Sequence, residues 1–126
     1  MNELELKQEC RRWQELLGLS HWLVDVKTVR GVEIGGKCGQ NDYSQADETS
    51  LIRIKAPEDY HGYFEYDMEA VLVHELLHLL LDVVIDSRNV SYEQVLSRLS
   101  RILVKLKRVK VKNLTTEAGD ELQYGQ

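Results

Sequence analysis

The chain has 126 residues and a formal net charge of −5. This length suits one domain with a modest core and leaves no room for a second catalytic lobe. The acidic balance argues against a protein whose whole surface grips nucleic acid. The start, MNELELKQECRRW, lacks the apolar stretch of a secretory signal, so we expect a cytoplasmic protein in which Cys10 and Cys38 are reduced thiols.

The first third of the chain predicts a helix followed by short strands. Apolar residues at helical spacing predict an amphipathic helix over residues 3–17, which Gly18 ends and which covers one face of a sheet. Alternation predicts a half-buried strand over residues 22–29. Three glycines then mark a turn, and residues 37–40 are a candidate second strand.

The clearest alternation lies in residues 49–55. Ile52 and Ile54 are predicted to face the core, while charged residues face outward. Charged outward positions suit the edge of a sheet, where exposed backbone can pair with an extended peptide. An aromatic loop follows at residues 60–66, and Asp67 is the predicted N-cap of the next helix.

The segment 68–85 is almost continuously apolar but carries the sequence His-Glu-Leu-Leu-His at residues 74–78. On a helix, His74, Glu75, His78 and Asp82 fall on one narrow stripe, and the rest of the circumference is apolar enough to be buried. Burying such groups unsatisfied costs about 1–3 kcal/mol each. Two imidazoles one turn apart with an adjacent carboxylate can hold a zinc ion and activate water. The alternative is a pair of core histidines bonded to backbone carbonyls. The ionisable groups also argue against a membrane span.

The last predicted helix is basic and is opened by a capping box of Ser91 and Gln94 after a turn at residues 87–89. Its predicted core stripe is Tyr92, Val95, Leu96, Leu99, Ile102, Leu103 and Leu106. Its cations are Arg98, Arg101, Lys105, Lys107, Arg108, Lys110 and Lys112, which suit a helix C-terminus but could also meet phosphates or an acidic partner. Residues 1–112 form the predicted domain, and residues 113–126 are a predicted loose tail.

This order of elements resembles the reduced core of the zincin metallopeptidases, including minimal gluzincin-like and SprT-like proteins and small phage- or prophage-encoded metallopeptidases. The resemblance rests on HELLH, on the preceding strand and, more weakly, on EQVLSRLSRILV at residues 93–104. It implies an α+β fold whose elements are, in chain order, an N-terminal helix, a small, mainly antiparallel three-stranded sheet, the HExxH helix and a C-terminal helix. It also implies that His74 and His78 bind Zn²⁺, that Glu75 is the general base, and that Glu93 is the third ligand.

Geometry bears on the third ligand, because a catalytic zinc site takes three protein ligands and keeps one position for water. Asp82 lies eight residues after His74, about 12 Å along a helix, which makes it a poor ligand and predicts that it supports the site from behind or lies at the surface. Asp86 lies farther still and could reach the ion only if the chain reversed sharply. If the helix that carries HELLH, here called the motif helix, continues through Ile85 and packs against the last helix as a tight hairpin, Glu93 lies about 9 Å too far from His78 to share a metal ion. The β-branched residues at 83–85 permit an earlier end that would bring Glu93 back.

The implied function is hydrolysis of a peptide held in an extended conformation. Zinc would lower the pKa of its bound water and Glu75 would take the proton. Side chains available to stabilise the oxyanion are Tyr60, His61, Tyr63, Tyr66 and Tyr92. Two alternatives stay open: a zinc-stabilised interaction module without turnover, as in a phage accessory protein, and a DNA-associated SprT-like protein that uses the basic helix.

Overall fold

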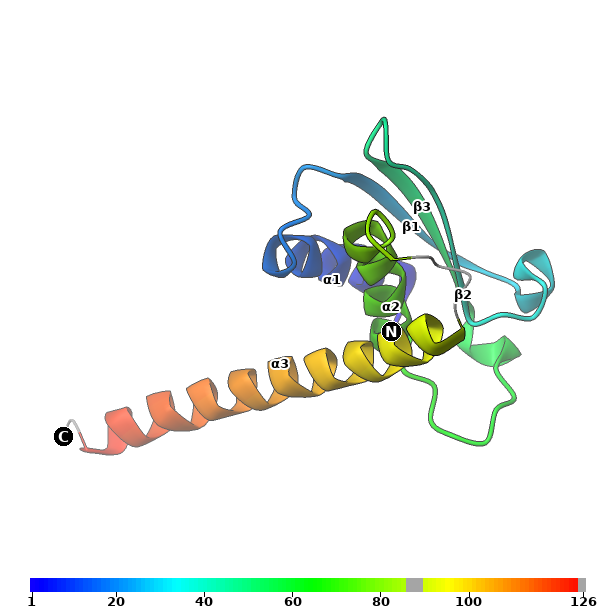
Figure 1. The fold of residues 1–126 in the computed structure, drawn as a ribbon. Helices are drawn as coiled ribbons and strands as arrows, with labels where there is room; N and C mark the ends of the chain where they lie inside the picture. The colour runs from blue at the N-terminus through cyan, green and yellow to red at the C-terminus, as the bar shows by residue number, and fades with distance from the viewer. Residues whose placement is uncertain (86–89, 125–126) are drawn as a thin grey trace.

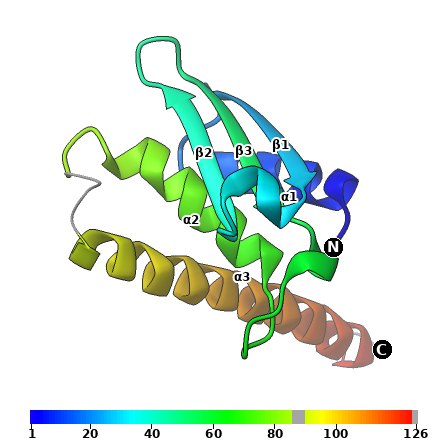
Figure 2. The same ribbon diagram turned by 90° about the vertical axis from the view of Figure 1, so that its right-hand side faces the viewer.

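The computed structural model describes residues 1–85 and 90–124, with the side chains of residues 1–85 and 90–112. The elements in chain order are α1 (Glu3–Leu16), β1 (Leu23–Val29), the 3-10 helix η1 (Gly31–Ile34), β2 (Gly39–Ser44), β3 (Thr49–Lys55), the 3-10 helix η2 (Pro57–Asp59), α2 (Met68–Leu81) and α3 (Val90–Tyr124). Helices α1 and α2 lie on one face of the sheet, and α3 crosses α2 and projects beyond the other elements (Figures 1 and 2). The predicted α+β class is confirmed.

The sheet is mixed, with strand order β1-β3-β2. Strands β1 and β3 are parallel, whereas β2 and β3 are antiparallel. The expected antiparallel predominance is therefore limited to one of the two pairings. The predicted edge position of residues 49–55 is wrong, because β3 is the central strand. Its outward charges have partners nearby: Arg53 pairs with Asp42 of β2 at 2.7 Å, and Lys55 Nζ donates to the Gly36 carbonyl at 2.7 Å. A charged outward face thus did not require an edge.

The strand predictions differ in how well they locate the strands. The bounds of β3 match the prediction, and Ile52 and Ile54 are fully buried. Strand β1 begins one residue later than expected. Strand β2 shares only two residues with the candidate at 37–40. Its sequence GQNDYS has no alternation of apolar residues, so pairing with β3 and not intrinsic preference defines it.

Helix α1 confirms the prediction for residues 3–17 to within one residue. Asn2 caps it by accepting from the Glu5 backbone N–H at 2.8 Å, and Glu5 completes a capping box. Leu6, Cys10 and Trp13 are buried in the core beneath the sheet. Both cysteines are free thiols, as expected.

Helix α2 begins after the predicted cap, since Asp67 accepts from the Ala70 backbone N–H at 3.2 Å. It ends at Leu81, four residues before Ile85. The residues after Asp82 are β-branched, which disfavours further helical turns. The chain therefore turns back early enough for α3 to start beside the motif.

Helix α3 departs from the prediction at both ends and in its core stripe. It begins at Val90, so Ser91 lies within it and is not its cap, and the predicted turn at 87–89 falls outside the described residues. Within residues 90–112, its buried side chains are Tyr92, Leu96, Ser100 and Val104, spaced four apart. The predicted core residues Val95, Ile102 and Leu106 are 57%, 53% and 60% exposed. The backbone of residues 113–124, within the predicted tail, continues α3 as a helix to Tyr124.

A buried ion cluster joins the three helices. Glu69 of α2 is only 5% exposed, and it accepts from Trp13 Nε1 at 2.7 Å, from Lys107 at 2.7 Å and from Arg108 at 3.1 Å. Lys107 also contacts Glu9, and Arg108 pairs with Asp67 at 3.0 Å. Helix α2 thus has a polar contact outside its motif stripe, and two of the cations on the basic helix are used within the fold.

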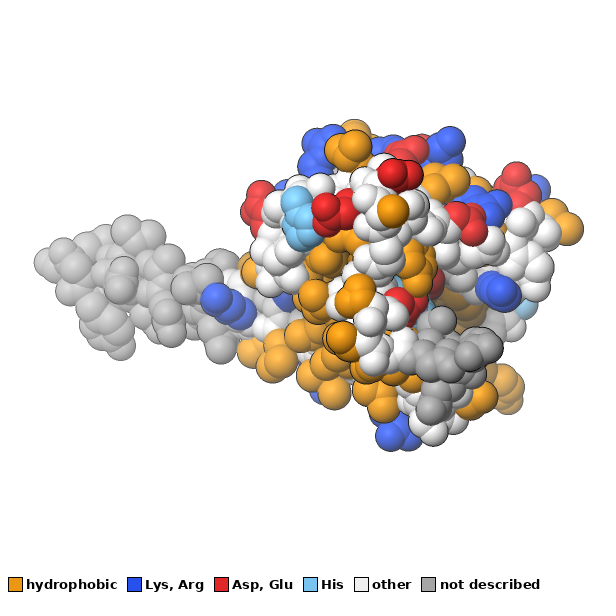
Figure 3. Space-filling view, turned by 45° about the horizontal axis from the view of Figure 1, so that its top comes forward, with side chains coloured by type: hydrophobic (Ala, Val, Ile, Leu, Met, Phe, Trp, Pro, Cys, Tyr) orange, Lys and Arg blue, Asp and Glu red, His pale blue; other side chains and the backbone are white. Residues whose placement is uncertain are grey.

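Hydrophobic side chains are also exposed where α3 leaves the other elements (Figure 3). Among the described residues, no helix is both long enough and apolar enough to cross a membrane.

Candidate metal centre

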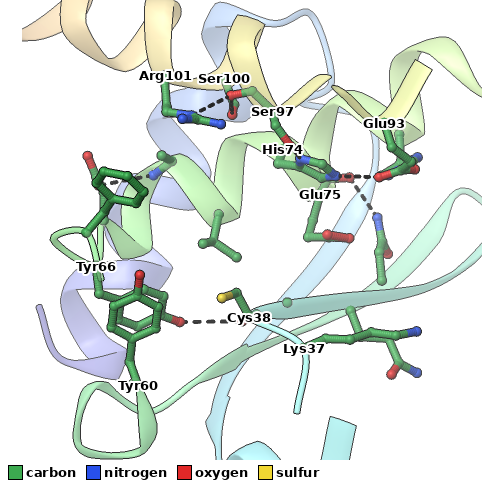
Figure 4. Close-up of a pocket in the computed structure, with 18 of the residues that line it drawn as sticks. Lys37, Cys38, Tyr60, Tyr66, His74, Glu75, Glu93, Ser97, Ser100 and Arg101 are labelled. Carbon is green, nitrogen blue, oxygen red and sulfur yellow. Dashed lines mark hydrogen bonds and ion pairs between the residues drawn. The ribbon is translucent and has the colours of Figure 1, made fainter. Parts of the chain in front are cut away.

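Three ligand-type side chains meet where α3 begins beside α2. His74 Nε2 lies 3.0 Å from Glu93 Oε2, and His78 Nε2 lies 3.1 Å from Glu93 Oε1. One ligand atom from each residue lies within 4.8 Å of the other two. Figure 4 shows Glu93 reaching from α3 toward the imidazole of His74. The three predicted metal ligands are therefore brought together, and we call His74, His78 and Glu93 the ligand group.

Each histidine is held through its other ring nitrogen. His78 Nδ1 lies 2.9 Å from Asp82 Oδ1, and His74 Nδ1 lies 3.2 Å from Ser97 Oγ. We assign the Nδ1–H of His78 as the donor to Asp82, because a carboxylate only accepts. In a neutral ring with this tautomer the Nε2 atom carries a lone pair toward Glu93, and a metal ion bound between them would satisfy both groups. Burial lowers the pKa of His74, against the opposing effect of Glu93, and favours the neutral ring that a metal requires.

This donor set suits zinc. Two imidazole nitrogens and one carboxylate are ligands that zinc takes in catalytic sites, where a fourth position is kept for water. Ligand atoms around a tetrahedral zinc ion lie about 3.3 Å apart, close to both His–Glu distances. The structure describes no other group of three such residues with this proximity in residues 1–85 and 90–112.

Asp82 is not a member of the ligand group but supports it. Its side chain is 6% exposed and accepts from the hydroxyls of Tyr92, at 2.6 Å, and Tyr43. Burial would raise the pKa of Asp82, but these hydrogen bonds and the one from His78 lower it below its usual value. Asp82 is thus a fixed anion behind His78, as its spacing predicted. Asp86 falls outside the described residues.

Glu75 lies beside the ligands with its carboxylate largely withdrawn from water. It is 7% exposed, and no hydrogen bond to its carboxylate is found among the described residues. Burial, with a further contribution from Glu93 and Asp82 against the opposing effect of His78, raises the pKa of Glu75 to about 7. A carboxylate with this pKa can accept and return a proton near neutral pH.

Strand β2 fixes the position of Glu75 through residues that the sequence pattern did not single out. Asn41 Nδ2 donates to the Glu75 carbonyl at 2.8 Å, and its Oδ1 accepts from Ser50 at 2.6 Å. A Cβ atom at Gly39 would lie 2.6 Å from Val71 Cγ1 and 3.4 Å from Glu75 Cγ. Glycine therefore allows the strand to approach the motif helix closely. The only sequence feature that indicates this close approach is a glycine, Gly39, at the start of the strand.

The ligand group opens into a cavity of about 750 Å³, which we call the site cavity. Residues of β2, α2, α3 and the aromatic loop line it. Among the predicted oxyanion-stabilising residues, Tyr60 and Tyr66 line it and stack on each other with ring centroids 4.6 Å apart. Tyr66 donates to the Lys55 carbonyl at 2.7 Å. His61 and Tyr63 are exposed and do not line the cavity, and Tyr92 is bonded to Asp82.

Searches against models of protein families, curated proteins and solved structures find no match for this chain. The chemistry of the site is therefore inferred from its own residues.

Proposed function

We propose that the protein is a zinc-dependent metallopeptidase. The observation that carries the proposal is the convergence of His74, His78 and Glu93 on one point, with the buried carboxyl of Glu75 beside them. A structural zinc site is usually closed by four protein ligands, whereas three ligands opening into a cavity suit catalysis. The two free thiols fit a reducing compartment such as the cytoplasm.

The residues of this chain have distinct roles in the proposed reaction. A bound zinc ion supplies Lewis acidity toward water and toward the substrate carbonyl. The Glu75 carboxylate accepts a proton from the attacking water and returns it to the leaving amine nitrogen. Asp82 and Ser97 orient the two histidines through Nδ1.

We place an extended peptide substrate along β2. This strand is an edge of the sheet, and Gly39, Gln40 and Asn41 line the site cavity. Its free backbone edge can pair with a peptide main chain, while the cavity takes side chains. This replaces the predicted use of residues 49–55, which form the central strand.

Removal and return of zinc tests the proposed function. Zinc-loaded protein is expected to cleave a mixture of casein-derived peptides, with new termini identified by mass spectrometry. Treatment with 1,10-phenanthroline should abolish cleavage, and added zinc should restore it. The His78→Ala variant serves as a control for contaminating proteases. Absence of cleavage by the zinc-loaded protein, or cleavage that persists in the variant, would contradict the proposal and leave a zinc-stabilised interaction module.

The Asp82→Asn variant is expected to bind zinc about 10–100-fold more weakly, because the neutral amide polarises His78 less than the carboxylate does. Competition with a chromophoric chelator measures this change. Asp47→Asn, an exposed acid in the β2–β3 turn, is the matched control and should leave the affinity unchanged. Equal affinities of wild type and Asp82→Asn would show that the contact with His78 has no effect on the site.

A further inference from the structure

The exposed cationic side chain of Arg101 lies on the wall of the site cavity, on the same helix as the ligand Glu93. Glu93, Ser97 and Arg101 follow one another at intervals of four along α3 and so share a face of the helix. All three line the site cavity. In Figure 4 they lie on the same side of the cavity, opposite Lys37 and Cys38.

The guanidinium of Arg101 is anchored at one end only. Its Nε–H donates to the Ser97 carbonyl at 3.0 Å, which draws the group back by one helical turn. That turn carries the Ser97 hydroxyl that contacts His74. The guanidinium is therefore about 5 Å from the level of Glu93 along the helix axis. Its two terminal nitrogens are left for another partner.

Among the described side chains, Arg101 lacks the acidic partners that the other cations on the inner side of α3 have. Lys107 and Arg108 each contact two acids of the fold. Within residues 1–85 and 90–112, no acid forms an ion pair with Arg101. The site-cavity acid nearest to it in sequence, Glu93, is taken by the two histidines. An anchored guanidinium with both terminal nitrogens unpaired matches a carboxylate, which it can bind through two parallel hydrogen bonds.

We propose that Arg101 binds a carboxylate group of the peptide substrate. The carboxylate belongs either to the C-terminus of the substrate or to an Asp or Glu side chain. This inference rests on the proposed function for its substrate, but the binding step itself needs neither zinc nor hydrolysis.

The test uses the metal-free protein, so that a carboxylate cannot bind through zinc. Three acetylated tripeptides are titrated: Ala-Ala-Ala with a free C-terminus, the same peptide as its amide, and Ala-Glu-Ala amide. The NMR signal of the Arg101 Nε–H group reports binding. We expect saturable shifts with one or both carboxylate peptides, and affinity at least about tenfold weaker for the neutral amide. A preference for the free C-terminus or for the Glu peptide identifies the source of the carboxylate.

Variants separate Arg101 from the general charge of α3. Arg101→Gln should weaken binding of the preferred carboxylate peptide at least about tenfold, and Arg101→Lys should recover only part of it. Arg98→Gln removes the same charge from an exposed position of the same helix outside the site cavity and should leave binding unchanged. Binding of the neutral peptide as tightly as its carboxylate counterparts, or equal losses in Arg101→Gln and Arg98→Gln, would overturn the inference. Peptide cleavage by the zinc-loaded protein is measured separately, so failure of either proposal is recognised by itself.

Discussion

The Glu75→Gln variant is expected to lose peptide hydrolysis by about 10²–10⁴-fold while it keeps its zinc. Glutamine has nearly the same shape as glutamate but cannot accept the proton of the attacking water, and a positioned general base contributes about this much to a rate. Glu75 is not one of the residues that converge as ligands, so zinc content should match that of the wild type. Turnover of casein-derived peptides and metal analysis of the same sample measure both effects. A variant that keeps full activity would exclude Glu75 as the base.

The same substitution has an expected effect on the stability of the metal-free protein. Burial raises the pKa of Glu75 to about 7 from its ordinary value of 4.5. The folded state therefore disfavours the charged carboxylate, so stability is lost as the pH rises from about 4.5 through 7. Glutamine cannot ionise and avoids this loss. The free energy of unfolding of Glu75→Gln minus that of the wild type should therefore be about 3 kcal/mol larger at pH 8 than at pH 4.

Urea unfolding in the presence of a chelator, at pH 4 and pH 8, measures this gain. Glu15→Gln, an exposed acid on α1, is the control and should show no pH-dependent difference from the wild type. A difference between Glu75→Gln and wild type that is equal at both pH values would show that Glu75 is not held in an environment that raises its pKa.

The Glu69→Ala variant is expected to lose about 3 kcal/mol of unfolding free energy. Removing one partner from a buried ion cluster leaves the others uncompensated, which costs about 3–5 kcal/mol. The lower end applies because Lys107 keeps Glu9 and Arg108 keeps Asp67. Trp13 also loses the acceptor of its indole N–H. Urea unfolding at pH 7 measures the loss, and Glu15→Ala should stay within about 0.5 kcal/mol of the wild type. A loss no larger than that of the control would contradict the stabilising role of the cluster.

The contribution of Glu69 to the free energy of unfolding is also expected to depend on pH. Burial would raise the pKa of Glu69, but hydrogen bonds from Lys107, Trp13 and Arg108 hold it below its ordinary value of 4.5. Its contribution is therefore present above pH 4.5 and is lost as the pH falls through the lowered value. The difference between wild type and Glu69→Ala should shrink in the most acidic conditions that still permit folding.

The sequence predicted two of the three ligands, His74 and His78, and the adjacent Glu75, because the helical period alone places these residues together. Glu93 depended on where α2 ends, and the β-branched residues after Asp82 were the only local indication of an early end. Gly39, Asn41 and Ser97 could not be found in this way. They act through contacts between β2, α2 and α3 that no local pattern encodes.

The errors in the fold have a common physical origin. Alternation in residues 49–55 predicts a strand but not its neighbours. Charged outward residues also suit a central strand here, because Asp42 and the Gly36 carbonyl accept from them. Likewise, apolar periodicity identified α3 but not which side meets α2. Tyr92 and Leu96 are buried, whereas Val95 and Ile102 are exposed. Periodicity gives the type of element, and partners set its orientation.

Metal stoichiometry and affinity in three variants test the central claim, which is that His74, His78 and Glu93 hold one zinc ion together. Metal analysis and competition with a chromophoric chelator should give one zinc ion per wild-type chain and a large loss of affinity in both His74→Ala and Glu93→Ala. Gln94→Ala, the exposed neighbour of Glu93 outside the site cavity, should bind as the wild type does. Loss of zinc in His74→Ala with full affinity in Glu93→Ala would contradict the three-residue site, and a wild-type chain that binds no zinc would contradict the metal centre itself.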